Sequence, residues 1–161
     1  MKNLTHIDQQ GQIRMVDISE KPRTFRLARA RAILKAKKET IKLIRKNLLA
    51  KGDVLSTARI AGILAAKKTS QLIPLTHPLN LTNLSIDVEL KKQKIILTAS
   101  VKTVGQTGPD IEAITAAAIA AITIYDMVKA IDREMTIEKI QLIEKFGGKS
   151  GHYQRRGYPD K

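Results

Sequence analysis

Hydrophobic and polar positions alternate in several stretches of the chain, and this period of two predicts strands. Residues 84–90 and 95–104 both alternate in this way, and the polar residues 91–94 between them predict the turn of a hairpin. A shorter alternation around residues 13–18 predicts an early strand, and residues 135–146 predict a last one.

A second period, of three and four residues, predicts helices. Residues 25–49 carry apolar side chains at this spacing, with basic residues elsewhere; these apolar side chains are Leu27, Ala30, Leu34, Ile41, Ile44 and Leu48. Gly52 then suits the end of this helix. Asp53 suits the N-cap of a second helix, predicted over residues 54–72. A third helix is predicted to begin at Pro109–Asp110 and to continue to about residue 133.

Small residues in the second predicted helix indicate close packing against another element. Gly62 is the clearest case, because glycine inside a helix costs about 1 kcal/mol relative to alanine and needs a compensating reason.

The order of these elements predicts a fold class. Without the helix at 54–72 it is β-α-β-β-α-β, the ferredoxin-like or split βαβ pattern. We therefore predict an α+β fold, a ferredoxin-like antiparallel sheet with helices on one face and one additional helix. Residues 1–151 are expected to form a single domain, and residues 152–161 a basic, mobile C-terminal tail.

Composition narrows the classes of protein. The chain has no cysteine, which excludes disulfides and thiolate metal sites. It shows no signal-peptide pattern and no 18-residue apolar run; the nearest candidate, 111–125, is short and contains Glu112. We expect a soluble cytoplasmic protein.

The formal net charge of +14 leaves three interpretations open. A basic surface suits nucleic acid, a polyanionic small substrate, or simple solubility.

The segment GGKSG at 147–151 resembles part of a phosphate loop. The P-loop pattern needs a glycine where this chain has Ile143, and it needs a following helix, so we exclude a nucleotide-hydrolase P-loop. A tail without fixed structure and an anion clamp built from backbone N–H groups and Lys149 both remain open.

His77 lies between two prolines in PLTHPL, residues 74–79. Pro74 and Pro78 each fix φ near −65° and explain a rigid turn, but they do not explain the histidine. No second histidine or carboxylate stands nearby at ligand spacing, so we predict no metal site.

Two acidic residues share the third predicted helix. Asp126 has apolar neighbours, and Lys129 lies three residues later on the same helix surface. One interpretation is an ordinary ion pair. The other is an acid/base group whose pKa is raised by burial and lowered by the lysine. Glu112 suits the positive end of the helix dipole. The two are 14 residues apart, roughly 21 Å at 1.5 Å per residue, so a shared site needs two subunits or a long substrate.

Three long motifs occur in order: KGDVLSTARIAGILAAKKTSQLIPLTHPL, TGPDIEAITAAAIAAITIYDMVKAI and GGKSG. With LTHID and MVDIS near the start, they closely resemble the molybdenum cofactor biosynthesis protein C family, the cyclic pyranopterin monophosphate synthases. The resemblance covers roughly residues 4–151, which it implies to be a single catalytic domain.

This resemblance implies a lyase and its assembly. The family converts 3′,8-cyclo-7,8-dihydroguanosine 5′-triphosphate to cyclic pyranopterin monophosphate and pyrophosphate. Its members are typically hexamers, trimers of dimers, with active sites between subunits. We expect no cofactor and no membrane partner, and no motif in the chain supplies an obvious metal site.

Residue by residue, the resemblance implies a site. Substrate-binding positions are Leu75, Thr76, His77, Ile111, Glu112, Lys145 and Lys149, and catalytic positions are Asp126, Lys51 and Lys129. Three residues depart from the common family pattern: Thr76 replaces a cysteine, Gln106 replaces a lysine, and Asp110 replaces a longer glutamate.

From these positions we expect Asp126 and Lys129 to act as an acid/base pair, in a site completed by Lys51 and His77 from another chain. A nucleic-acid-binding module using a basic helix at 26–46, and an inactive paralogue serving in assembly, are the alternatives.

Overall fold

An antiparallel sheet with strand order β2-β3-β1-β4-β5 carries the fold. The computed structural model describes residues 6–7, 10–149 and 151–158. The strands are β1 (Thr24–Lys35), β2 (Leu81–Leu90), β3 (Lys94–Gly105), β4 (Thr136–Phe146) and β5 (His152–Gln154). The helices are α1 (Lys38–Arg45), α2 (Val54–Lys67), α3 (Thr69–Leu72) and α4 (Asp110–Val128).

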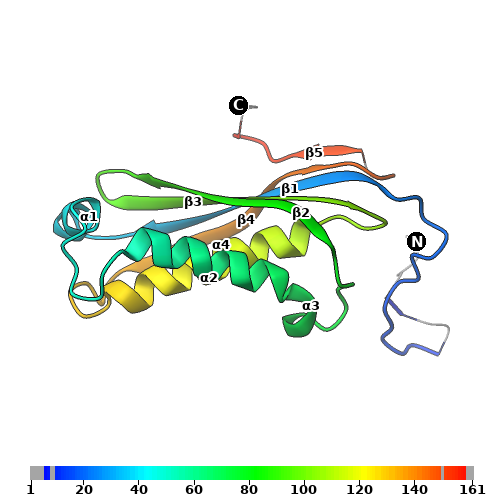
Figure 1. Cartoon of the computed structure of the whole chain (residues 1–161), viewed down its shortest axis with the longest axis horizontal. Helices are drawn as coiled ribbons and strands as arrows, with labels where there is room; N and C mark the ends of the chain where they lie inside the picture. The colour runs from blue at the N-terminus through cyan, green and yellow to red at the C-terminus, as the bar shows by residue number, and fades with distance from the viewer. Residues whose placement is uncertain (1–5, 8–9, 150, 159–161) are drawn as a thin grey trace.

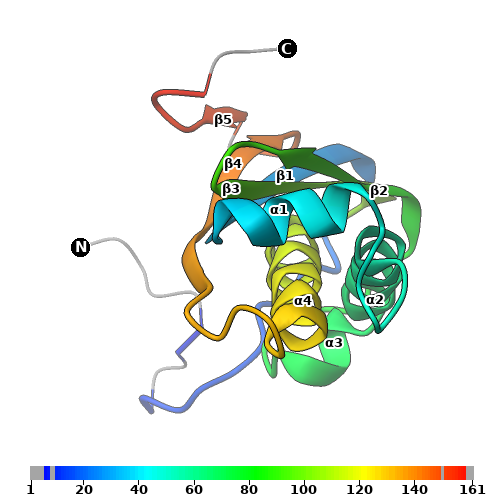
Figure 2. The ribbon, with the colours of Figure 1, turned by 90° about the vertical axis from the view of Figure 1, so that its left-hand side faces the viewer.

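The two long helices lie side by side on one face of the sheet. Figure 1 shows α2 and α4 below the strands, and Figure 2 shows the same layers end on. The arrangement β1-α2-β2-β3-α4-β4, with β1 between β3 and β4, is ferredoxin-like. The predicted fold class is therefore confirmed, but some of its elements are not those that the sequence indicated.

The predicted helix at 25–49 is wrong. Residues 24–35 form the central strand β1, and only 38–45 are helical. Alanine and arginine favour helices when isolated, and the 3/4 spacing added to that signal. Burial against α4 decides otherwise, because Ala28, Ala30 and Ala32 alternate with arginines and all three face the helices. The helix α2 therefore belongs to the core pattern, and α1 is the additional one.

The predicted strand at 13–18 is also wrong. Residues 14–18 belong to no strand, and the one bridge of this segment pairs Ile7 with Ile13. Its alternation has another cause, since Val16 and Ile18 are half-buried against the body of the protein while Asp17 is exposed.

The remaining predictions differ only in bounds. The hairpin and the last strand are confirmed as β2, β3 and β4. The predicted helix at 54–72 divides at Lys68 into α2 and α3, and the last helix ends at Val128 rather than near residue 133.

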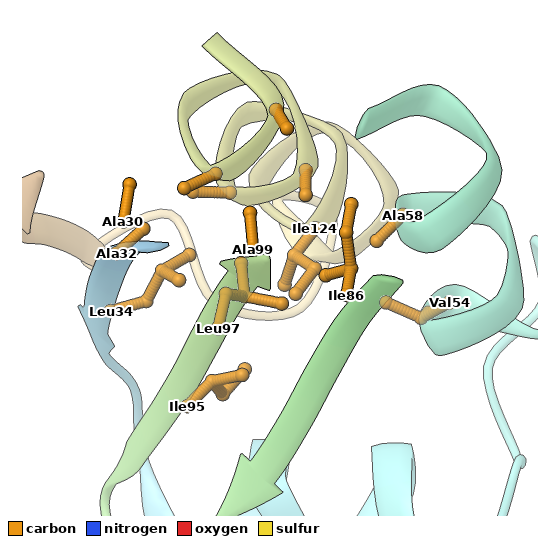
Figure 3. Packing of buried hydrophobic residues seen from close by; sticks show 14 of the residues in the cluster. Ala30, Ala32, Leu34, Val54, Ala58, Ile86, Ile95, Leu97, Ala99 and Ile124 are labelled. Carbon is orange, nitrogen blue, oxygen red and sulfur yellow. The ribbon is translucent and has the colours of Figure 1, made fainter. Parts of the chain in front are cut away.

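Small side chains let the layers approach closely. Alanines dominate the contact between α4 and the sheet, and Figure 3 shows Ala30, Ala32 and Ala99 with Leu97 and Ile124. By length and composition α4 is the one described helix that could cross a membrane, but half of it is buried in this core.

Gly62 has the packing reason that we expected. A Cβ at this position in α2 would stand 2.7 Å from the carbonyl oxygen of Ala116 in α4, and would also collide with Ile86 of β2. Only glycine allows α2, α4 and β2 to meet here.

The C-terminal residues extend the sheet. Residues 152–154 pair with 144–146 of β4, and the Tyr158 ring then lies beside the Arg31 guanidinium, 4.7 Å from its carbon to the ring centroid. Residues 159–161 of the predicted tail lie outside the described residues.

Candidate functional site

A cavity of about 500 Å³ opens at the N-terminal end of α4. This volume lies in the range of small-molecule sites. Five parts of the chain line it: His6, residues 16–21, the turn at 73–79, the loop and first turn of α4 at 107–112, and Lys145 of β4.

The proline-bounded turn supplies one wall of the cavity. Leu75, Thr76 and His77 all line it and are half-buried. The Thr76 hydroxyl donates to the carbonyl oxygen of Ile73 at 2.8 Å, which closes the turn. The structure therefore gathers these three predicted residues at one place, with His77 facing the cavity.

Glu112 and Ile111 come from the first turn of α4. Ile111 is half-buried in the lining, whereas Glu112 is only 4 % exposed. Burial raises the pKa of Glu112 to about 7, and the nearby Asp110 charge adds to the rise. Such a carboxyl can hold or release a proton at neutral pH, which helix-dipole compensation alone did not predict.

Lys145 faces the same cavity from β4. Its ammonium donates to an oxygen of Asp110 at 2.8 Å, and this bond holds the cation at the N-terminal end of α4. Lys21 adds a second lysine to the lining, from the segment before β1.

The double glycine after β4 folds onto Arg26. Gly147 and Gly148 have φ of +99° and +76°, and a Cβ at Gly148 would collide with the buried Arg26 guanidinium. Arg26 in turn donates from Nε to the carbonyl oxygen of Gly105 at 2.8 Å. The loop is thus packed in place, but Lys149 is exposed and does not line the cavity.

A second cluster stands at the other end of α4. The Asp126 carboxylate lies 2.7 Å from Lys129 Nζ and 3.2 Å from Lys51 Nζ, and Lys51 also donates to the backbone carbonyl of Asp126 at 2.9 Å. The connection before α2 brings Lys51 to the C-terminal end of α4. The three predicted catalytic residues are therefore neighbours.

The structure decides between the two interpretations of Asp126 and corrects one expectation about Lys51. The Asp126 side chain is 55 % exposed, so the cluster is an ordinary exposed ion pair in which burial has the smallest effect on the pKa. Hydrogen bonds from Lys129 and Lys51 instead lower the pKa of Asp126, and the pKa of Lys129 is raised in return. In addition, Lys51 reaches Asp126 within the same chain rather than from another one.

The cavity and the cluster do not meet in one chain. Glu112 and Asp126 occupy opposite ends of one helix, roughly 21 Å apart along its axis. Among the described residues, no three His, Cys, Asp or Glu side chains are grouped in a way that could hold a metal ion.

Sequence reasoning missed part of the cavity lining. Val16 and Ile18 stand in the segment predicted as a strand, and Lys21 follows it. Thr107 and Gly108 precede α4, and His6 lies near the start of the chain. The half-buried alternation of Val16 and Ile18 was the available signal, although it indicates a cavity wall here and not a sheet.

Comparisons with known proteins show to which family this chain is related. The MoaC family model matches residues 15–148. A protein of Thermomicrobium roseum is 55 % identical over 157 residues, with 96 % of this chain and 95 % of that protein covered. Proteins of Syntrophomonas wolfei (54 %, covering 95 % and 99 %) and Thermoanaerobacter pseudethanolicus (52 %, covering 95 % and 98 %) are similar. All three are named cyclic pyranopterin monophosphate synthase. The chain belongs to the MoaC family.

Proposed function

We propose that this protein is a cyclic pyranopterin monophosphate synthase. It is a lyase of molybdenum cofactor biosynthesis that converts 3′,8-cyclo-7,8-dihydroguanosine 5′-triphosphate to cyclic pyranopterin monophosphate and pyrophosphate in the cytoplasm. The observation that carries the proposal is the Asp126–Lys51–Lys129 cluster, with N–O distances of 2.7 and 3.2 Å, at the three positions where the family resemblance puts catalysis.

Groups at the two ends of α4 can carry out different proton transfers. Asp126 is ionised at neutral pH and can accept a proton, while the two ammonium groups beside it can donate one. Glu112, with a pKa near 7, can exchange a proton at the other end. The reaction rearranges a ring with several proton transfers, which needs groups of both kinds.

The cavity offers contacts for both the triphosphate and the ring system of the substrate. Lys21 and Lys145 are cations that can face a triphosphate, and cations also stabilise the pyrophosphate that leaves. Leu75, Thr76, His77 and Ile111 supply apolar and polar contacts for the ring system. Lys149, which is exposed, is assigned to the outer edge of the anion site.

The separation of the two clusters supports a shared site. One chain cannot bring Glu112 and Asp126 to the same small molecule across roughly 21 Å. A second copy must supply the missing half, and the family's hexamer, a trimer of dimers, is the assembly that we propose.

No specific observation favours a nucleic-acid-binding function. The continuous basic helix at 26–46 that would have contacted phosphates does not exist, because residues 26–35 belong to the core strand β1 and only residues 38–45 are helical. Arg26 in this strand is buried.

Pyrophosphate release from the cyclised guanosine triphosphate tests the function. We expect release by the wild-type protein and its loss in Asp126→Asn, which keeps the shape of the side chain and removes its charge. Asp87→Asn, an exposed carboxylate on β2, is the matched control and should retain release. A folded wild-type protein that releases no pyrophosphate would favour the inactive paralogue.

A further inference from the structure

Residues 16–21 form a segment that we call the strap, and it covers one side of the cavity. Val16, Ile18 and Lys21 all line the cavity, and the first two are half-buried. No strand pairing holds the strap among the described residues, so its position depends on other contacts.

The strap has internal order. Asp17 accepts hydrogen bonds from the Ser19 amide at 2.9 Å and from the Ser19 hydroxyl at 2.7 Å. The Lys21 amide donates to the Ile18 carbonyl oxygen at 2.9 Å. These bonds shape a turn, but they do not attach it to the rest of the protein.

Gln106 makes that attachment. Its side-chain amide Nε2 donates to the carbonyl oxygens of Ile18 at 3.0 Å and Ser19 at 3.1 Å. Gln106 follows the end of β3 and precedes Thr107 and Gly108, which line the same cavity. One neutral side chain therefore joins two walls of the cavity that are more than 80 positions apart in the sequence.

We infer that Gln106 is a positioning residue that holds the strap on the cavity and so orients Lys21 toward a polyanionic substrate. The glutamine brings no positive charge of its own, so its contribution passes through the strap. The substrate part of the inference rests on the proposed function, whereas the strap contact does not.

Three variants separate hydrogen-bond donation from size and charge. Gln106→Met keeps the length of the side chain and its neutrality but removes both donated bonds. Gln106→Lys restores a donor. Gln93→Met, in the exposed turn between β2 and β3 at the far end of β3, is the matched control.

Amide hydrogen exchange of the free protein measures how firmly the strap is held. We expect Gln106→Met to speed amide exchange in peptides covering residues 14–21, with exchange in β3 unchanged. Gln106→Lys and Gln93→Met should exchange as the wild type does. Unchanged exchange at residues 14–21 in Gln106→Met would overturn the inference, even if the wild type proved to have no synthase activity.

Steady-state kinetics measures the effect of the strap attachment on substrate binding. Loss of the attachment should raise KM about fivefold, the effect of roughly one hydrogen bond, and leave kcat within about twofold, because the proposed proton-transfer groups are untouched. Gln106→Lys should restore KM. A KM no higher than that of Gln93→Met, or a fall confined to kcat, would contradict the positioning role.

Discussion

At the scale of single residues, Glu112 and Asp126 of α4 differ because their surroundings differ. Glu112 is buried and has a pKa of about 7, whereas Asp126 is half-exposed between two ammonium groups that lower its pKa. The sequence showed a lysine near Asp126 and could predict that ion pair. It could not show that Glu112 is buried, because the residues that exclude water from it come from distant segments.

The raised pKa of Glu112 predicts a stability that falls as pH rises. Between the ordinary value of 4.5 and about 7, the folded state binds more protons than the unfolded state, so the free energy of unfolding decreases across this window. Well above pH 7 the ionised, buried carboxylate lowers stability by about 3 kcal/mol.

Glu112→Gln should remove this dependence. We expect the variant to be more stable than the wild type at pH 8 and similar to it near pH 4.5, in denaturant unfolding of both proteins across that range. Pyrophosphate release should be lost, since the amide cannot exchange the proton. Parallel stability curves for the two proteins from pH 4.5 to 8 would show that Glu112 does not titrate in this window.

At the scale of elements, the contact between α2 and α4 depends on the absence of one side chain. Gly62→Ala should destabilise the protein by about 1–3 kcal/mol through overpacking, although alanine is the better helix former. Ile60→Ala, at an exposed position of the same helix, is the control and should change stability little. Chemical unfolding measures both, and an equal or higher stability for Gly62→Ala would mean that the helices can separate at little cost.

The C-terminal segment pairs with residues 144–146 and so covers the last part of the edge of β4, which would otherwise expose unpaired backbone groups. Tyr158 fixes this segment through its ring over Arg31 and its hydroxyl against Gln141. Removing both contacts in Tyr158→Leu should cost about 1–2 kcal/mol.

Tyr158→Phe is the informative partner variant, because it keeps the ring over Arg31 and loses only the hydroxyl. Its loss of thermal stability should be smaller than that of Tyr158→Leu. If the two variants melt together at the wild-type temperature, the segment does not depend on Tyr158.

At the scale of the whole molecule, we propose that the cavity and the Asp126 cluster are two halves of one site to which two chains contribute. Chains carrying Asp126→Asn and chains carrying His77→Ala should each be inactive alone. After the two are mixed through a denatured or exchanging state, about a quarter of the wild-type activity should return, because half of the two-fold dimers are mixed and each of these has one intact site. No recovery in confirmed mixed oligomers would mean that the two halves act within one chain.

The sequence by itself determined what local pattern and chemistry decide. Alternation predicted β2, β3 and β4, the turn chemistry predicted the start of α2, and the motifs predicted the family and its site positions. These features depend on residues that are neighbours in the sequence, so they can be predicted without knowing any distant contact.

The tertiary structure alone decided the rest. Residues 24–35 became a strand because α4 and two neighbouring strands bury its alanines, which outweighs their helix propensity. The pKa of Glu112, the attachment of the strap by Gln106 and the meeting of Lys51 with Asp126 each join segments far apart in the chain. Burial and hydrogen bonding at such contacts depend on distance in space, and spacing along the sequence does not encode that distance.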